Sequence, residues 1–105
     1  MPPGREALID LLASIYRAVD WRAQGGSSVQ DRWSGMLMVA SRAETVGELV
    51  NNLCKRLGVG SVWGDTMPAQ IAACEPYEAD LLDWVDRETV PVAMRAYSRA
   101  RERRS

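Results

Sequence analysis

Three aspartates in the second half of the sequence, Asp80, Asp83 and Asp86, are spaced so that a helix would carry them along one face. Carboxylates arranged in this way can act as general acid and base, or can bind a hard cation. Either role needs a cleft or a polarising partner, and the sequence shows neither. Asp83 also precedes Arg87 by four residues, the order that favours an ion pair within a helix. We therefore interpret the spacing as a solvated helix face and predict no catalytic residue and no metal site.

Nucleophilic chemistry is limited by two cysteines, Cys54 and Cys74, and by the absence of histidine. Without histidine the chain alone cannot form a Ser-His-Asp triad, a Cys-His pair or a His-ligated zinc site. The two cysteines form no CxxC motif and are too few for a disulfide scaffold. Cys54 lies on an apolar stripe and should be buried, whereas Cys74, at a helix end, should be more accessible. We predict inert thiols and no cofactor.

A row of arginines near the C-terminus, Arg95, Arg99 and Arg103, could bind phosphate or an acidic protein. The alternative is a solvated helix end whose positive charges suit the helix dipole. Residues 65–86 hold six acidic residues and no basic one, whereas residues 87–105 hold six arginines and two glutamates. The sequence leaves open whether these two segments pair with each other or face partners. We expect the basic row to turn away from the acidic segment as a cationic arm.

Two apolar side chains occupy positions where a partner could reach them. Trp21 falls on the polar side of the first predicted helix, and Met38 lies opposite Trp33 on the second. Trp21 is either covered by the glycine-rich turn that follows it or exposed for a partner, and tryptophan is frequent at binding hot spots. The candidate partner-binding residues are therefore Trp21, Met38, Arg95, Arg99 and Arg103.

These side chains must be positioned by helices, because apolar residues recur with helical spacing along most of the chain. The clearest pattern is that of residues 46–57, which follow a capping box at Thr45 and end before Gly58. Pro91 must end or kink any helix that precedes it. The remaining predicted helices are residues 5–22, 29 to about 43, 67–74, a helix with Pro76 in its first turn, and about 92–103.

The composition bounds the class of protein. The chain has 105 residues, a net charge of −1 and 47% hydrophobic residues, which is typical of one soluble globular domain. No stretch has the roughly 18 apolar residues of a membrane span, and the N-terminus lacks the apolar core of a signal peptide. We predict a single all-α domain over residues 1–105, a compact bundle of five or six short helices with disordered ends at 1–4 and 104–105. A cytoplasmic location is expected.

The sequence favours a non-catalytic interaction protein that acts by surface contact with a larger protein or nucleoprotein. It would be an adaptor or inhibitor, of the kind that phages and mobile elements encode. The alternative is a nucleic-acid-binding small subunit of a larger assembly, which would use the C-terminal arginines. A small enzyme that uses the aspartates is a third reading. A homo-oligomer is left open, and no membrane partner is expected.

Overall fold

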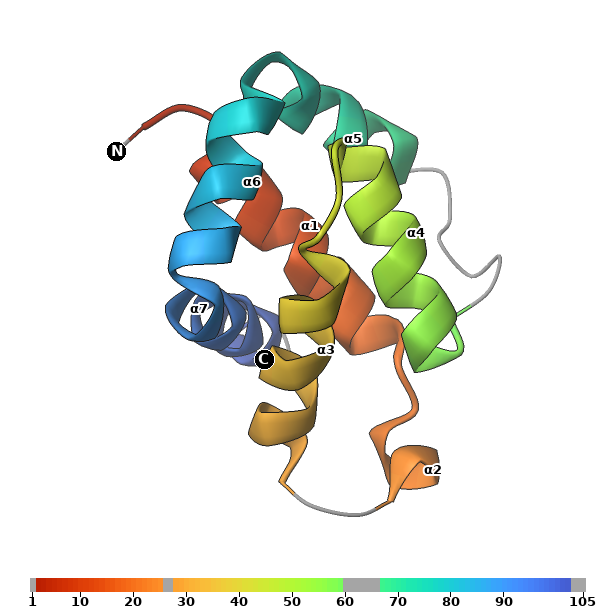
Figure 1. Cartoon of the computed structure of the whole chain (residues 1–105). Helices are drawn as coiled ribbons and strands as arrows, with labels where there is room; N and C mark the ends of the chain where they lie inside the picture. The colour runs from red at the N-terminus through yellow and green to blue at the C-terminus, as the bar shows by residue number, and fades with distance from the viewer. Residues whose placement is uncertain (1, 26–27, 60–66, 103–105) are drawn as a thin grey trace.

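The broad apolar face of the first helix places that helix at the centre of the molecule. In the computed structural model, which describes residues 2–25, 28–59 and 67–102, α1 (Arg5–Ala18) packs against α7 (Thr89–Glu102) and α5 (Met67–Cys74) (Figure 1). The first helix is therefore contacted from more than one side. Its buried side chains are Leu8, Ile9, Leu11, Leu12, Ala13 and Ile15.

The predicted all-α fold is confirmed, since the described ranges contain helices and no strand. The radius of gyration of 12.6 Å is close to the roughly 13 Å expected of a compact domain of this length. The remaining elements are α2 (Trp21–Gln24), α3 (Val29–Ala40), α4 (Val46–Leu57), the 3-10 turn η1 (Glu75–Tyr77) and α6 (Glu78–Arg87).

The helix α4 has the predicted boundaries, because both of its ends are set by local chemistry. The Thr45 side chain accepts a hydrogen bond from the backbone N–H of Glu48 at 3.0 Å. At the other end Gly58 adopts a left-handed conformation with φ of 68°, which glycine reaches without steric cost. The apolar stripe between these caps is buried, from Val46 to Leu57.

The predicted first helix, residues 5–22, is wrong at its C-terminal end. The helix α1 stops at Ala18, and Val19 is extended with ψ of 136°. A new helix, α2, then begins at Trp21, and the Asp20 side chain caps it by accepting from the N–H of Ala23 at 3.3 Å. A residue that caps a following helix in this way cannot also continue the preceding one. The break changes the direction in which Trp21 projects.

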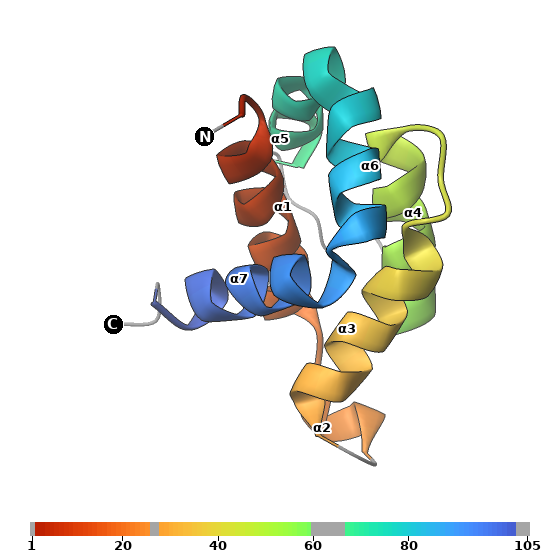
Figure 2. The ribbon, with the colours of Figure 1, turned by 60° about the vertical axis from the view of Figure 1, so that its left-hand side comes forward.

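The last helix begins earlier than predicted, at Thr89, and Pro91 lies in its first turn. A proline is tolerated there because the first backbone N–H groups of a helix have no intrahelical partner. Glu88 separates the two last helices with a non-helical conformation. Figure 2 shows that α7 crosses the molecule beside α1 and does not continue the direction of α6.

The second predicted helix is shorter than expected, because α3 ends at Ala40. It is joined to α7 by Trp33, which is fully buried. The indole N–H of Trp33 donates to the backbone oxygen of Ala93 at 2.8 Å. A buried indole needs such an acceptor, so this bond fixes how α3 and α7 cross.

The N-terminal end is described from Pro2 onward. Gly4 precedes α1 with φ of 87°, and a Cβ atom at this position would meet the Tyr77 ring at 2.9 Å. Only glycine fits this close approach without a shift of the ring. Residues 104–105 lie outside the described residues.

Candidate functional site

Four aromatic side chains, each from a different helix, meet near the C-terminal end of α1. The Tyr16 ring centroid lies 5.0 Å from that of Trp21, 5.4 Å from Trp33 and 5.4 Å from Tyr97. Trp33 and Tyr97 contact Tyr16 edge to face, an arrangement that aromatic rings favour. Because Trp33 is buried in the core, the cluster is anchored to the rigid part of the molecule.

Trp21 is partly buried in this cluster and is not a freely exposed side chain. Its indole N–H donates to the backbone oxygen of Tyr16 at 3.0 Å. Its ring also packs edge to face with Trp33 at 6.3 Å. The sequence placed Trp21 on the polar side of a continuous helix. That placement is corrected by the break at Val19 and Asp20, which turns the ring back onto Tyr16.

A surface hollow of about 440 Å³ opens beside Trp21. We call it the aromatic–arginine hollow, and its lining residues are Tyr16, Arg17, Val19, Trp21, Ala100 and Arg101. Arg17 and Arg101 are exposed and form no ion pair with any described residue. The Arg17 guanidinium makes a long hydrogen bond to the Ser14 hydroxyl, at 3.4 Å. Arg101 lies 5.4 Å from the centre of the Tyr97 ring and donates to its hydroxyl at 3.3 Å.

The predicted cationic arm is wrong for Arg95 and Arg99, because both pair with acidic residues of α1. Arg95 lies 2.7 Å from a carboxylate oxygen of Glu6, and Arg99 lies 2.6 Å from the other. Arg99 also contacts Asp10 at 2.5 Å. We call these four residues the α1–α7 ion-pair cluster. Arg95 and Arg99 thus do not extend as a free arm, and Arg103 lies outside the described residues.

The electrostatics of this cluster favour the charged forms of its members. The hydrogen bond from Arg99 is the main cause that holds the pKa of the Glu6 carboxyl below its usual value, and the charge of Arg95 acts in the same direction. Hydrogen bonds to Glu6 and then Asp10 raise the pKa of Arg99. The charges of Arg95 and Arg99 are therefore largely matched within the chain.

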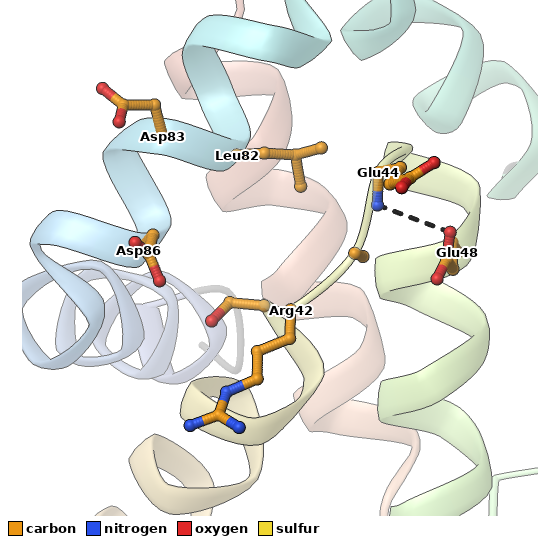
Figure 3. Close-up of a pocket in the computed structure, with 8 residues that line it drawn as sticks. Arg42, Glu44, Glu48, Leu82, Asp83 and Asp86 are labelled. Carbon is orange, nitrogen blue, oxygen red and sulfur yellow. Dashed lines mark hydrogen bonds between the residues drawn. The ribbon is translucent and has the colours of Figure 1, made fainter.

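A second, more open hollow of about 730 Å³ lies between the α3–α4 connection and α6 (Figure 3). Asp83 and Asp86 stand on one side, and Glu44 and Glu48 on the other. Figure 3 shows that these carboxylates do not converge on a point, and the guanidinium of Arg42 extends away from them. Among the described residues no group of three or more potential ligands is placed to hold a metal ion. We call this region the acidic hollow.

The aspartates singled out from the sequence lie on the exposed side of α6. Asp80, Asp83 and Asp86 are all exposed, and Asp83 pairs with Arg87 at 2.9 Å. Since both partners of this pair are solvated, it contributes little to stability. The residues form no enclosed site with which acid–base chemistry could be performed.

Both cysteines are buried, and the expected accessibility of Cys74 is wrong. Cys74 has no exposed surface and Cys54 is 2% exposed. Burial raises the pKa of each thiol to about 11, so the reactive thiolate is scarce at neutral pH. Cys74 is covered because α5 packs its last turn against the core, which its position at a helix end did not indicate.

Met38 is 52% exposed, and the adjacent Val39 is 44% exposed. Nothing among the described residues covers this part of α3. It is separate from the lining of the aromatic–arginine hollow, so the structure does not bring Met38 together with Trp21.

Sequence reasoning missed Tyr16, Arg17, Tyr97 and Arg101 as parts of one surface. One local signal was available, because Arg101 follows Tyr97 by four residues, the spacing at which side chains on a helix meet. No local spacing in the sequence indicates that α7 packs against the end of α1.

No protein-family model, curated protein or solved structure significantly matches this chain. In the described part of the chain, no helix has both the length and the apolar character needed to cross a membrane.

Proposed function

We propose that this chain is a non-catalytic interaction protein, an adaptor or inhibitor, which acts through surface contact with a larger protein. Its contact surface is the aromatic–arginine hollow. The observation that carries this proposal is a pair of exposed arginines beside Trp21 and Tyr16, Arg17 and Arg101, which form no ion pair within residues 2–25, 28–59 and 67–102. The cytoplasmic location expected from the sequence is part of the same proposal.

The composition of the hollow supports a protein partner. Tryptophan, tyrosine and arginine are the residues most enriched at binding hot spots. Here Trp21 is held by a hydrogen bond to Tyr16 and by contact with Trp33, so its ring loses little freedom on binding. A surface that is already ordered binds with a smaller entropic cost than a flexible one.

The buried thiols and the divergent carboxylates support the non-catalytic part of the proposal. A nucleophilic cysteine needs a lowered pKa, and both thiols have a raised one. General acid–base catalysis needs carboxylates that converge on a substrate, and those of the acidic hollow point apart.

The alternative of a nucleic-acid-binding subunit has less support. The arginine row was its main basis, and Arg95 and Arg99 already pair with α1. A chain with a net charge of −1 also lacks the general attraction to phosphate that a basic protein has. Arg17 and Arg101 remain available to either kind of partner.

Site-specific photo-crosslinking in the native host tests the proposal. A photoreactive residue replaces Arg22, which follows Trp21 and is exposed, or Asp86 in the acidic hollow as the matched control. We expect a discrete protein adduct from position 22 and none from position 86. The adduct should be lost when Trp21→Ala is added. An adduct that persists with Trp21→Ala, or that forms only from position 86, would contradict the proposed surface.

A further inference from the structure

We infer that the aromatic–arginine hollow binds an acidic segment of its protein partner, an inference that rests on the proposed function. A carboxylate of the segment lies between Arg17 and Arg101. An apolar side chain next to that carboxylate packs against Trp21 and Val19. The class of ligand is thus a short acidic peptide that also carries an aliphatic or aromatic side chain.

The unmatched charge of the hollow points to an anion. Elsewhere on α6 and α7 the arginines have carboxylate partners, as Arg87 has in Asp83 and Arg99 has in Glu6 and Asp10. Arg17 and Arg101 have none among the described residues and come from different helices. Guanidinium groups match carboxylates in geometry as well as in charge. Both of them line one hollow, and the hollow therefore suits an anion such as a carboxylate.

The position of Arg101 is restrained before any ligand binds. Its guanidinium lies against the face of Tyr97 and donates to the hydroxyl of the same side chain. Tyr97 in turn packs edge to face with Tyr16. These contacts connect the Arg101 guanidinium to the aromatic cluster. The Arg101 side chain is therefore partly ordered before binding and loses less conformational entropy when a ligand binds.

The aromatic part of the hollow calls for an apolar group beside the carboxylate. The only polar group of the Trp21 ring, its N–H, already donates to Tyr16. What the ring offers to a ligand is therefore apolar surface. Val19 and Ala100 also line the hollow, but they are nearly buried and add little surface of their own. With a volume of about 440 Å³ the hollow falls in the range of roughly 300–1,000 Å³ that is usual for ligand sites. This size suits a short segment.

A nucleic acid strand fits the hollow less well than an acidic peptide. Binding of a strand needs cations that follow successive phosphates, together with ring faces on which bases stack. The next arginines along α7, Arg99 and Arg95, are occupied by Glu6 and Asp10. A strand that ran along α7 would also meet those two carboxylates.

Nuclear magnetic resonance on the full-length chain labelled with nitrogen-15 tests the inference. The chain has four tryptophans, and the indole N–H signal of Trp21 reports on the hollow directly. The probes are a short capped peptide of alternating glutamate and leucine, the same peptide with glutamine in place of glutamate, and a short oligothymidylate.

We expect the glutamate peptide to shift the Trp21 signal with the lowest dissociation constant of the three probes. The variant Arg17→Gln/Arg101→Gln should weaken that binding about tenfold, since two solvated ion pairs are lost. The control Arg42→Gln/Arg87→Gln makes the same change of net charge away from the hollow and should bind as the unaltered chain does.

The inference is overturned if the glutamine peptide binds as tightly as the glutamate peptide, or if both double variants weaken binding equally. It is also overturned if oligothymidylate alone shifts the Trp21 signal, or if no probe does. The crosslinking from position 22 distinguishes these failures from failure of the proposed function. An adduct that depends on Trp21, together with no acidic-peptide binding, would overturn only the ligand class.

Discussion

The helix α7 uses its arginines in two different ways within two turns. Arg95 and Arg99 belong to the α1–α7 ion-pair cluster, where Glu6 and Asp10 match their charges. Arg101 follows Arg99 by two residues and therefore lies on another face of the helix. It lies against Tyr97 at the edge of the aromatic–arginine hollow and has no carboxylate partner among the described residues. The residue type therefore does not decide the role of a surface arginine. That role depends on which side chains the neighbouring helix places beside the arginine.

The largest expected effect comes from removing the aromatic side chain that supports both regions. Trp33→Ala deletes a fully buried ring and its hydrogen bond to Ala93, which joins α3 to α7. We expect a loss of about 3–5 kcal/mol in the free energy of unfolding, measured by denaturant titration. A loss below about 1 kcal/mol would show that Trp33 does not support this crossing.

Trp21→Ala should have a smaller effect on stability and a larger one on association. The ring is partly buried and donates one hydrogen bond, so its loss should cost about 2 kcal/mol. Binding of the partner, or of the glutamate peptide, should weaken more than about tenfold, as is usual for a hot-spot residue. Isothermal titration and thermal denaturation measure the two effects. A large fall in melting temperature with intact binding would instead make Trp21 a core residue.

Single arginine variants sharpen the comparison directly. Arg99→Gln removes both of its ion pairs to α1 and should lower the melting temperature by a few degrees at low salt, with a smaller effect at high salt. Arg101→Gln removes no ion pair that the described part of the chain contains, and it should leave the melting temperature nearly unchanged at either salt concentration. Equal losses in the two variants would mean that the two regions do not differ in this way.

The smallest expected effect is a pH dependence confined to the ion-pair cluster. The folded chain lowers the pKa of Glu6 from its usual 4.5, so the ionised carboxyl stabilises the fold above that pH. This contribution is lost as the pH falls through the lower, folded-state pKa. The stability difference between the unaltered chain and Glu6→Gln should therefore be complete at neutral pH and shrink in acid. A difference that grows in acid would contradict the assigned direction.

Local sequence determined the helices of this protein and some of their ends. In α4 the apolar stripe, the N-cap Thr45 and the C-terminal Gly58 each depend on residues within one or two turns. For this reason the sequence predicted them correctly. The burial of Cys54 follows from the same stripe. Where a local alternative competed, as when Asp20 capped a new helix, the periodicity alone predicted the wrong boundary.

The candidate site was decided only by the tertiary structure. Arg95 and Glu6 are 89 residues apart, and their pairing depends on how α7 crosses α1. The aromatic–arginine hollow likewise forms because the end of α1, the start of α2 and the last turns of α7 meet at one place. Spacing along a helix groups side chains by face, but it carries no information on which distant face will lie opposite. For that reason the sequence placed Arg95, Arg99 and Arg103 in one row, whereas the fold separates the paired arginines from Arg101.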